Sequence, residues 1–319
     1  MRSDRDPAGP PPKGAGIDAA GGTGPAAPAA GIIALLGRPN VGKSTLLNRL
    51  VGDKVAIVSP VPQTTRIPIE VWWESPAGRV RILDTPGIHR PHRPMNRRMV
   101  RSAFRAMRAA DLLLVLVDAE AGIGPGDRFV TREAGALGSP CILVINKIDR
   151  VRKPLLLPIM DRMARLAAFR EIVPISALRG DNCDRLPGIL QRHLAGAAVP
   201  ETIGPGPTEE FRIAETIREQ VLLQTRAELP HSTAVLLDRR ENRGGFHWIH
   251  ATLVVEKESQ KGILIGRGGA RLQAIGSSAR RELEARLGAR IVLKLWVRAI
   301  PNWRDDDRLL ERLGLPSGG

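Results

Sequence analysis

The sequence contains a glycine-rich segment whose residue types suit the binding of phosphate groups. Residues 37–44 read Gly-Arg-Pro-Asn-Val-Gly-Lys-Ser; an apolar run precedes them and a helix-like pattern follows. Glycines let backbone N–H groups turn toward phosphate oxygens, and the N-terminus of a helix adds a favourable partial charge. A strand, such a loop and a helix in this order are typical of a P-loop. We therefore predict that these loop residues bind a nucleotide: Gly37, Asn40, Val41, Gly42, Lys43, Ser44 and Thr45.

A second segment has the residues that a metal-bound triphosphate requires. In the P-loop, Lys43 should reach the β- and γ-phosphates, and the hydroxyl of Ser44 should ligate Mg²⁺. Residues 84–87 read Asp-Thr-Pro-Gly after another apolar run, which places Asp84 at the carboxyl end of an expected strand. We predict that Asp84 binds Mg²⁺ and that the N–H of Gly87 meets the γ-phosphate.

Residues 63–66, Gln-Thr-Thr-Arg, lie between these two segments, where a switch loop is expected. One threonine should complete the ligand shell of Mg²⁺ when the γ-phosphate is bound. We favour Thr65 over Thr64 for this role, which makes Ser44, Thr65 and Asp84 the predicted metal ligands. A threonine-rich loop without a metal role is the alternative.

Two later segments have residues that can recognise a base. Asp149 closes the sequence Asn-Lys-Ile-Asp, and its carboxylate can accept from both the ring N1–H and the 2-amino group of guanine. Adenine offers neither donor, and unpaired buried acceptors are costly, so Asp149 argues against an ATPase. Lys147 can lie along the base plane, Asn146 can brace the loops, and the segment at 175–177 should give guanine O6 a backbone N–H. The predicted base-binding residues are Asn146, Lys147, Asp149, Ser176 and Ala177.

The residue after the Asp-Thr-Pro-Gly segment bears on the rate of hydrolysis. It is Ile88, where Ras-type GTPases have a glutamine that orients the attacking water. Isoleucine cannot do this, so hydrolysis should be slow without a partner. Asn40 either helps to hold a monovalent cation such as K⁺ near the phosphates or braces the loop, and both interpretations stay open. The residues expected to act in hydrolysis are Lys43, Thr65, Gly87 and Asn40.

The elements around these segments alternate between strands and helices. The expected strands are 32–36, 79–83, 112–118, 142–145 and 172–175, and the expected helices include 44–51 and 95–110. Fully apolar strands that alternate with helices predict a doubly wound, mostly parallel α/β sheet, with its ligand at the carboxyl ends of the strands. We assign residues 31–195 to this domain, after a Pro/Gly/Ala-rich extension at 1–30 that reads as disordered.

A Gly/Pro-rich linker at 196–208 precedes a second pattern in residues 209–314, followed by a short tail at 315–319. The second pattern predicts a helix, two antiparallel strands, a short helix, a Gly-Arg-Gly-Gly turn, an amphipathic helix, a strand and a final helix. The first helix is expected at 209–227, and the two antiparallel strands at 233–240 and 246–256. The short helix begins at about residue 259, the turn is 266–269, and the amphipathic helix has Leu272 to Leu287 on its apolar face. The last strand is expected at 290–299 and the final helix at 302–313, with Asn302 as its N-cap.

These segments together resemble the Era family of GTPases, of the translation-factor-related class. The resemblance rests on residues 37–45, 63–66, 84–87, 146–149 and 175–177, and in the second part on 228–232, 255–261, 265–269 and 295–298. It covers about residues 31–314. Departures are the Gly/Pro-rich linker, Arg267 in place of a more usual lysine, and Gly262 where a bulkier residue is commoner.

The resemblance implies a C-terminal type II KH domain that binds 16S ribosomal RNA during assembly of the small ribosomal subunit. The residues agree, because a GXXG turn between two helices can clamp four nucleotides of single-stranded RNA through its backbone. Lys294 and Ile263 would border the same groove. The predicted RNA-binding residues are Lys257, Lys261, Ile265, Gly266, Arg267, Gly268, Gly269 and Arg271.

The composition agrees with a polyanionic partner. The net charge is +15 and the sequence pI is about 11.1, and residues 207–319 hold only 19 basic against 15 acidic side chains, so most of the excess lies before them. The two cysteines lack metal-ligand spacing and are expected to be reduced in a cytoplasmic protein. No apolar run is long enough to span a membrane. The resemblance adds peripheral association with the inner membrane as an option, and we expect a monomer.

A run of arginines without acidic residues between them follows the Asp-Thr-Pro-Gly segment: Arg90, Arg93, Arg97, Arg98, Arg101, Arg105 and Arg108. Such runs are often solvated helix faces, but we hypothesise that this one contacts ribosomal RNA. Two rival functions remain. One is a non-enzymatic RNA-binding assembly factor that uses GTP only as a structural ligand. The other is a tandem or tRNA-modifying GTPase, which the single P-loop and the lack of a C-terminal catalytic cysteine motif disfavour.

Overall fold

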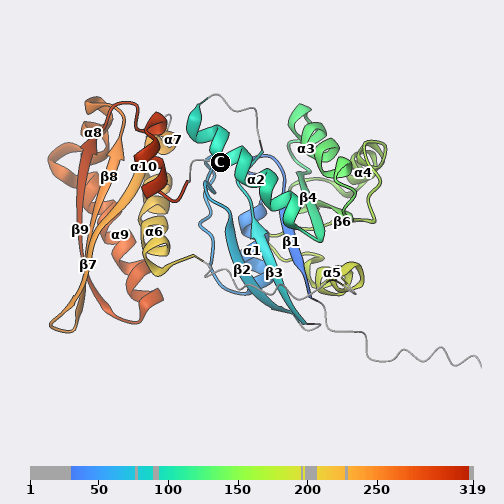
Figure 1. Cartoon of the computed structure of the whole chain (residues 1–319), viewed down its shortest axis with the longest axis horizontal. Coiled ribbons are helices and arrows are strands. Elements are labelled where there is room, and N and C mark those ends of the chain that lie inside the picture. The colour runs from blue at the N-terminus through green and yellow to red at the C-terminus, as the bar shows by residue number, and fades with distance from the viewer. Residues whose placement is uncertain are drawn as a thin grey trace, which may run out of the picture.

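The computed structural model describes residues 30–75, 78–88, 93–194, 197, 207–226 and 229–315. The predictions for the N-terminal extension, for most of the linker, for Arg90 and for nearly all of the C-terminal tail therefore fall on residues outside these ranges. The described part forms two domains that lie side by side (Figure 1). We call them the G domain and the KH domain.

The G domain is built on a six-stranded sheet with the order β2-β3-β1-β4-β5-β6. All neighbouring pairs are parallel except β2 with β3, which is antiparallel. Strand β4 is buried along its whole length, as its unbroken apolar sequence predicts. The strands are β1 (Ile32–Leu36), β2 (Ile69–Ser75), β3 (Gly78–Asp84), β4 (Leu112–Asp118), β5 (Cys141–Asn146) and β6 (Glu171–Pro174).

Five helices cover the two faces of this sheet. Apolar side chains of α1 and α5 pack in one core cluster, and those of α2, α3 and α4 pack in the other. The helices are α1 (Lys43–Val51), α2 (Pro94–Ala109), α3 (Pro125–Ala136), α4 (Leu156–Ala164) and α5 (Leu186–Leu194), with single 3₁₀ turns at η1 (Ile148–Arg150), η2 (Lys153–Leu155) and η3 (Cys183–Arg185). This three-layer arrangement leaves the carboxyl edge of the sheet open for a ligand.

The KH domain has a three-stranded sheet with the order β7-β8-β9, in which β7 is antiparallel and β9 parallel to β8. Helices α6 and α9 pack on one face of this sheet through a shared apolar cluster. The elements are α6 (Glu209–Gln224), α7 (Leu229–Ser232), β7 (Ala234–Arg243), β8 (Phe246–Val255), α8 (Glu258–Ile265), η4 (Arg267–Gly269), α9 (Ala270–Leu287), β9 (Arg290–Ala299), η5 (Trp303–Asp305) and α10 (Asp307–Arg312).

The fold class predicted from the sequence is confirmed, and one element is corrected. The expected helix at 302–313 is interrupted: η5 comes first, and α10 begins only at Asp307. Asn302 has a left-handed backbone (φ 53°) and makes no capping hydrogen bond. Asp306 is the N-cap of α10, because its side chain accepts from the N–H of Leu309 at 3.1 Å.

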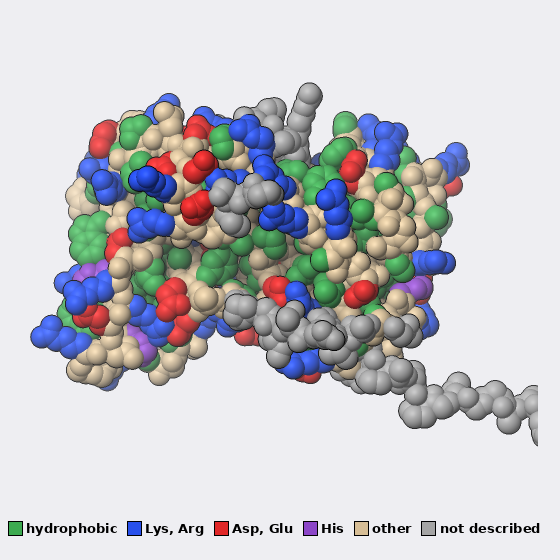
Figure 2. Space-filling view, in the orientation of Figure 1, with side chains coloured by type: hydrophobic (Ala, Val, Ile, Leu, Met, Phe, Trp, Pro, Cys, Tyr) green, Lys and Arg blue, Asp and Glu red, His purple; other side chains and the backbone are tan. Residues whose placement is uncertain are grey.

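The surface of the two domains carries basic side chains on both sides of their junction (Figure 2). None of the helices within the described residues is long and apolar enough to cross a lipid bilayer.

Candidate nucleotide and RNA sites

The P-loop lies between β1 and α1, at the carboxyl edge of the G-domain sheet. Gly42 has a left-handed backbone (φ 100°), and a Cβ added there would lie 2.1 Å from the amide nitrogen of Asn146. Gly87 approaches the same loop so closely that a Cβ would lie 2.6 Å from the backbone nitrogen of Pro39. The two glycines therefore let the base-reading loop and the Asp-Thr-Pro-Gly segment pack directly against the P-loop.

The three predicted metal ligands lie together at the start of α1. The hydroxyl of Ser44 donates to Asp84 Oδ2 at 2.6 Å, and the hydroxyl of Thr65 lies 2.9 Å from that of Ser44 and 3.1 Å from Asp84 Oδ2. Thr64 instead bonds to Ser59 and to the carbonyl of Val61. The geometry therefore favours Thr65 over Thr64, as the sequence did.

This cluster fits a bound Mg²⁺. Its three side chains offer oxygen atoms, which are the ligands that Mg²⁺ prefers. Asp84 is fully buried, and its second carboxylate oxygen, Oδ1, has no hydrogen-bond partner in the described residues. A buried, unsatisfied carboxylate oxygen is costly, and a cation or its water shell would satisfy it.

Lys43 lies buried beside this cluster. Its ammonium donates to the carbonyls of Gly37 at 3.2 Å and Arg38 at 3.0 Å. Burial lowers the pKa of Lys43 to about 8, and the nearby negative charge of Asp84 partly opposes this effect. Burial likewise raises the pKa of Asp84. A bound polyphosphate would raise the pKa of Lys43 and a bound cation would lower that of Asp84, so each would oppose the effect of burial.

The base-reading loops are tied to the P-loop by one side chain. The amide of Asn146 donates to the carbonyl of Val41 at 2.8 Å and accepts from the N–H of Ala177 at 2.9 Å. Asn146 thus braces two loops, which is the role expected for it. Lys147 has a left-handed backbone, and its ammonium lies 2.5 Å from Asp118 at the end of β4.

The expected guanine O6 donor is engaged elsewhere. The N–H of Ala177 bonds to Asn146, and the N–H of Ser176 donates to the carbonyl of Asp181 at 3.0 Å. In this arrangement both amides of the Ser176–Ala177 pair have partners within the protein, and their role toward guanine O6 stays a prediction. The hydrogen bonds that hold the loop in place use the amides that we had assigned to the base.

Asp149 keeps the charge that guanine recognition needs. A hydrogen bond from the side chain of Ser176 lowers the pKa of Asp149, and the positive charges of Arg179 and Arg150 act in the same direction. The carboxylate is therefore ionised at neutral pH and can only accept hydrogen bonds. The N1–H and 2-amino groups of guanine are matching donors.

Ile88 and Asn40 have contacts that define their roles in this structure. The Ile88 side chain is 1% exposed and packs in the core with Leu36 and Leu83, so it cannot orient water. The amide of Asn40 donates to the carbonyl of Pro60 at 2.6 Å. This bond is the bracing role considered for Asn40, and the cation role stays a prediction.

A cavity of about 410 Å³ is bordered by residues of the P-loop, of the loop around Thr65 and of the Asn-Lys-Ile-Asp segment, and it extends to Asp149 and Leu178. Two residues that contact the base-reading side chains were missed by sequence reasoning. Asp118 ends an apolar run at the same sheet edge as Asp84 and Asn146, which is a signal that could have identified it. Arg179, whose guanidinium lies 3.6 Å from Asp149, follows Ser-Ala-Leu in a loop and gave no signal.

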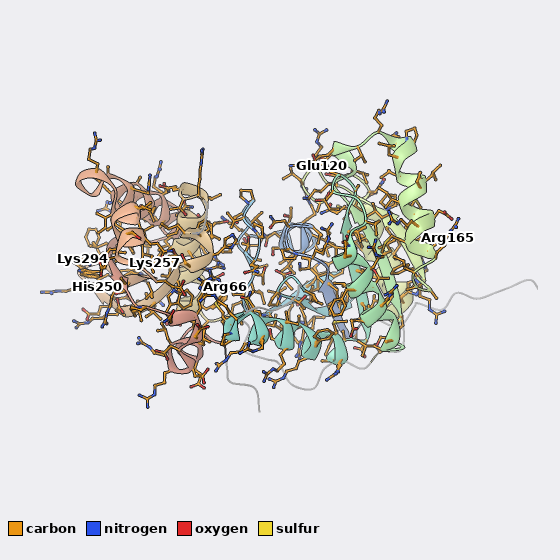
Figure 3. All side chains as sticks on the ribbon, turned by 90° about the horizontal axis from the view of Figure 1, so that it is seen from above. Arg66, Glu120, Arg165, His250, Lys257 and Lys294 are labelled. Carbon is orange, nitrogen blue, oxygen red and sulfur yellow. The ribbon has the colours of Figure 1, made fainter. Side chains whose placement is uncertain are left out.

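In the KH domain, the GXXG turn joins α8 to α9. Gly266, Gly268 and Gly269 all have positive φ, and a Cβ at Gly266 would lie 2.8 Å from the side chain of Arg271. The structure brings the predicted RNA-binding residues to this turn and to α8 before it. Figure 3 labels Lys257 and Lys294 on this domain, with Lys294 at the end away from the G domain.

Three predicted RNA-binding side chains differ in their exposure and in their contacts within the protein. Arg267 is exposed, as expected for a phosphate contact. Arg271 donates to the carbonyl of Ile263 at 2.6 Å and so braces the end of α8. Lys261 lies 3.5 Å from Glu258, a loose surface pair.

The loop of residues 52–68, between α1 and β2, is the switch loop, and the KH domain holds it. Lys54 lies 2.5 Å from both Glu219 and Glu282, and the carbonyl of Thr64 accepts from Arg218. The guanidinium of Arg66 is buried and donates to backbone carbonyls of the KH domain at Thr233 (2.8 Å), Pro230 (3.2 Å) and His231 (3.3 Å). Burial lowers the pKa of Arg66 to about 9.

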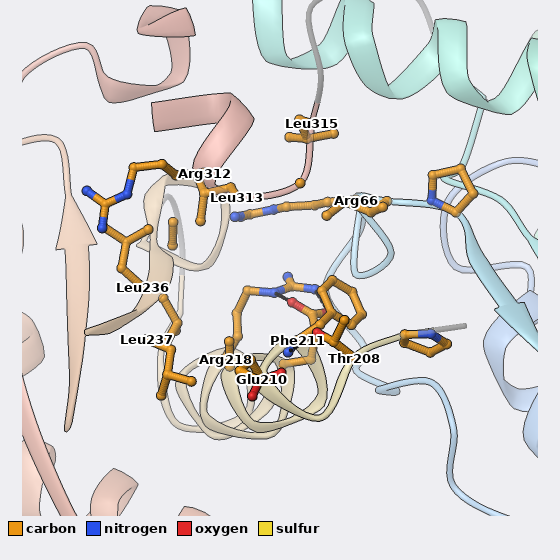
Figure 4. A pocket seen from close by; sticks show the side chains of 18 of the residues that line it. Arg66, Thr208, Glu210, Phe211, Arg218, Leu236, Leu237, Arg312, Leu313 and Leu315 are labelled. Atoms are coloured by element: carbon orange, nitrogen blue, oxygen red, sulfur yellow. Dashed lines mark hydrogen bonds and ion pairs between the residues drawn. The ribbon is translucent and has the colours of Figure 1, made fainter. Parts of the chain in front are cut away.

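Arg66 and Arg218 enter a cavity of about 630 Å³ between the domains from the switch loop and from α6 (Figure 4). Thr65, a predicted metal ligand, therefore lies between two residues, Thr64 and Arg66, that contact the other domain. No sequence motif had indicated these contacts.

The arginine run on α2 divides into two groups. Arg98 is buried and bonds to the carbonyl of Leu315 and to Asp307, and Arg93 lies 3.4 Å from Glu256. Both residues join the domains, and burial removes Arg98 from the hypothesised RNA face. The exposed members are Arg97, Arg101, Arg105 and Arg108.

Comparisons with known proteins agree with both sites. Residues 32–147 match the family described as "50S ribosome-binding GTPase", and residues 228–304 match the KH domain family. GTPase Era of Lacticaseibacillus paracasei is 42% identical over 287 residues, which are 89% of this chain and 96% of that protein. The chain belongs to the GTPase Era family.

Two solved Era structures are similar over the whole described fold. A point variant of Aquifex aeolicus Era bound to GDP·AlF4⁻ matches with a TM-score of 0.86 and 35% identity, over 91% of this chain and 100% of that one. Era in complex with MgGDPNP and nucleotides 1506–1542 of 16S ribosomal RNA matches with the same score and identity, over 91% and 99%. The likeness therefore covers both domains of this Era family member.

Proposed function

We propose that this chain is a GTP-hydrolysing switch protein that binds 16S ribosomal RNA through its KH domain and acts in assembly of the small ribosomal subunit. Its membership of the Era family supports the GTPase activity, and the solved Era complex with a 16S RNA segment supports the RNA partner. The observation that carries the proposal is the position of Thr65, a metal-site residue whose chain neighbours contact the KH domain.

At the nucleotide end, each residue group has a separate task. The P-loop amides and Lys43 hold the phosphates, and Asp149 selects guanine. Ser44, Thr65 and Asp84 would hold Mg²⁺, which neutralises charge on the β- and γ-phosphates when bound. Because Ile88 is buried, water must be placed by backbone groups or by a partner, and hydrolysis by the free protein is slow.

At the other end, the switch loop couples the nucleotide to the RNA-binding domain. The γ-phosphate and the metal favour one position of Thr65, and Arg66 and Lys54 transmit that position to α7 and α6. A change at Thr65 therefore alters how the KH domain is held. The GXXG turn would clamp unpaired nucleotides, and Arg267 would contact their phosphates.

Binding and hydrolysis measurements test this function. Purified protein should bind GTP and GDP much more tightly than ATP in calorimetry, and RNA of the 16S 3′ region should crosslink in the presence of a non-hydrolysable GTP analogue. Hydrolysis should be slow alone and faster with that RNA. Running the assay in K⁺ and in Na⁺ tests the cation role of Asn40, and equal rates would remove it.

Each alternative has its own outcome. Tight GTP binding without turnover, with or without RNA, would identify a non-enzymatic assembly factor. Absence of RNA binding by the intact chain would contradict the proposal. We place the protein in the cytoplasm, where ribosomal subunits are assembled. Association with the inner membrane and a monomeric state remain proposals that sedimentation with vesicles and light scattering would test.

A further inference from the structure

One face of the KH sheet is open and carries most of the domain's aromatic side chains. Alternate residues of β8 and β9 point away from α6 and α9, and the register pairs Phe246 with Arg290 and His250 with Lys294. The residues of this aromatic face are Phe246, Trp248, His250, Arg290, Lys294 and Trp296. In Figure 2, hydrophobic, basic and histidine side chains gather at this end of the molecule.

The chain leaves this face uncovered. The far end of the same sheet face, at Val254 and Leu236, is buried under Trp303 and α10. The end that bears the aromatic residues has no such cover in the described residues: Trp296 is 48% exposed and Phe246 is 37% exposed. Exposing a tryptophan to water is unfavourable, which is why such groupings usually mark binding surfaces.

Basic side chains lie next to the aromatic rings on this face. The imidazole of His250 lies 5.4 Å from the Trp296 ring, with the two planes tilted by 40°. The ammonium of Lys294 lies 5.1 Å from the centre of Trp248, and the guanidinium of Arg290 lies 6.0 Å from that of Phe246. These contacts hold the positive charges close to the exposed rings.

The charge around the face is positive. The strands contribute five basic residues, Arg239, Arg243, Arg290, Lys294 and Arg298, and two acidic residues, Asp238 and Glu241. Both acidic groups already have partners, since Asp238 accepts from Thr252 at 2.7 Å and Glu241 pairs with Arg239. The remaining cations favour an anionic partner that also offers flat rings. Unpaired nucleic acid has both properties, because bases stack on aromatic side chains while phosphates meet the cations.

We propose that this aromatic face is a second RNA-binding surface, on which unpaired nucleotides stack against Trp296 and His250. It rests on the proposed function, since it assumes that the KH domain binds RNA. The GXXG turn lies on the helical side of the sheet, and β9 is the edge strand between the two surfaces. An RNA strand that leaves the GXXG groove at this edge continues onto the aromatic face.

Two RNAs of different length distinguish binding at the aromatic face from binding in the GXXG groove. One is the segment corresponding to nucleotides 1506–1542 of 16S RNA, as in the solved Era complex; the other is trimmed to about six nucleotides to fill only the groove. Trp296→Ala should weaken binding of the long RNA at least fivefold, since a base stack is worth about 1–3 kcal/mol, and leave the short RNA unchanged.

Matched variants separate a stacking role from a general effect of substitution. Trp296→Phe should restore most of the affinity, because it keeps a ring at this position. Leu157→Ala removes an even more exposed apolar side chain (69%) on α4 and should change the binding of neither RNA. Lys261→Glu, beside the groove, should weaken the binding of both RNAs. Long RNA should also quench tryptophan fluorescence more in the wild type than in Trp296→Phe.

The outcomes distinguish the two proposals. If the wild type binds neither RNA, the proposed function fails. If the wild type binds both and Trp296→Ala binds the long RNA equally well, the second surface is refuted. If Trp296→Ala weakens only binding to assembled small subunits and not to the naked long RNA, the face contacts a ribosomal protein, and the RNA proposal is likewise overturned.

Discussion

At the scale of single residues, we infer that recognition of guanine depends on Asp149. Its ionised carboxylate can accept hydrogen bonds from both the N1–H and the 2-amino group of guanine, whereas the NH2 of an amide at this position would face the 2-amino group, donor against donor. Xanthine has a carbonyl where guanine has its 2-amino group, so Asp149→Asn should prefer XTP over GTP. We expect the affinity for GTP to fall at least about 100-fold. Calorimetry with both nucleotides measures this, and a variant that still prefers GTP would contradict the assignment.

Lys43 should make nucleotide binding depend on pH. Its pKa is about 8 in the free protein, below its ordinary value, and phosphates would raise it again. Below pH 8 the ammonium is already charged, so affinity for GTP should be nearly constant. Above pH 8 binding must take up a proton, and affinity should fall by up to about tenfold per pH unit. Titrations from pH 6.5 to 9.5 test this, and Lys43→Ala should bind weakly with no such slope.

At the scale of elements, the strands and helices that border the nucleotide site were predictable because their sequences have one clear period. Strand β4 is uniformly apolar, and α9 has a regular apolar stripe. Edge strand β2 was missed although its alternate residues Ile69, Val71 and Trp73 are buried, a period of two that is a strand signal. Helix α4 was missed because Pro158 and a mixed pattern obscure its period.

The site was predictable where a side chain alone defines the chemistry, as for Lys43, Ser44 and Asp84. It was not predictable where tertiary contacts decide. The amides at Ser176 and Ala177 are engaged by Asp181 and Asn146, which a sequence cannot show. Likewise, Arg98 and Arg97 are adjacent and chemically identical, yet one is buried between domains and the other is exposed.

The start of α10 offers a test of the corrected helix boundary. Asp306→Ala removes the only side-chain cap of a six-residue helix and should lower the free energy of unfolding of the KH domain by about 1 kcal/mol. Asp306→Ser keeps a capping oxygen and should lose much less. Urea unfolding followed by tryptophan fluorescence measures both. Equal stability of Asp306→Ala and the wild type would show that the cap does not contribute.

At the scale of the whole molecule, the contact of Arg66 with the KH domain should couple the affinity for RNA to the bound nucleotide. We expect the wild type to bind 16S RNA with different affinities in its GTP-analogue and GDP states. Arg66→Ala removes three hydrogen bonds to the KH backbone, so the ratio of these affinities should move toward one. Arg79→Ala, an exposed arginine on β3, is the control with the same charge change. An unchanged ratio in Arg66→Ala would exclude this coupling route.

The exposed arginines of α2 are the remaining candidates for an RNA-facing surface. Replacing Arg97, Arg101 and Arg105 by Glu leaves the domain contact at Arg98 intact. The triple variant should bind the small subunit more weakly, with a salt slope reduced by about 0.7–0.9 for each phosphate that is no longer neutralised. An unchanged salt slope in this variant would identify the run as an ordinary solvated helix face. The control with the same change in charge replaces three exposed arginines by Glu: Arg152 before α4, Arg162 on it and Arg165 just after it.

The carboxyl end of the fold has a practical consequence for handling this protein. The carbonyl of Leu315 accepts from Arg98 at 2.5 Å, its side chain is buried, and Gly314 is so close to Ile67 that a Cβ would lie 2.9 Å away. A purification tag or fluorescent fusion joined directly to Leu315 would begin beside Ile67 in the expected switch loop. Strand β1 begins at Ile32, opposite the carboxyl ends of the strands where the nucleotide loops lie, so labels for binding assays belong at the amino end of the chain.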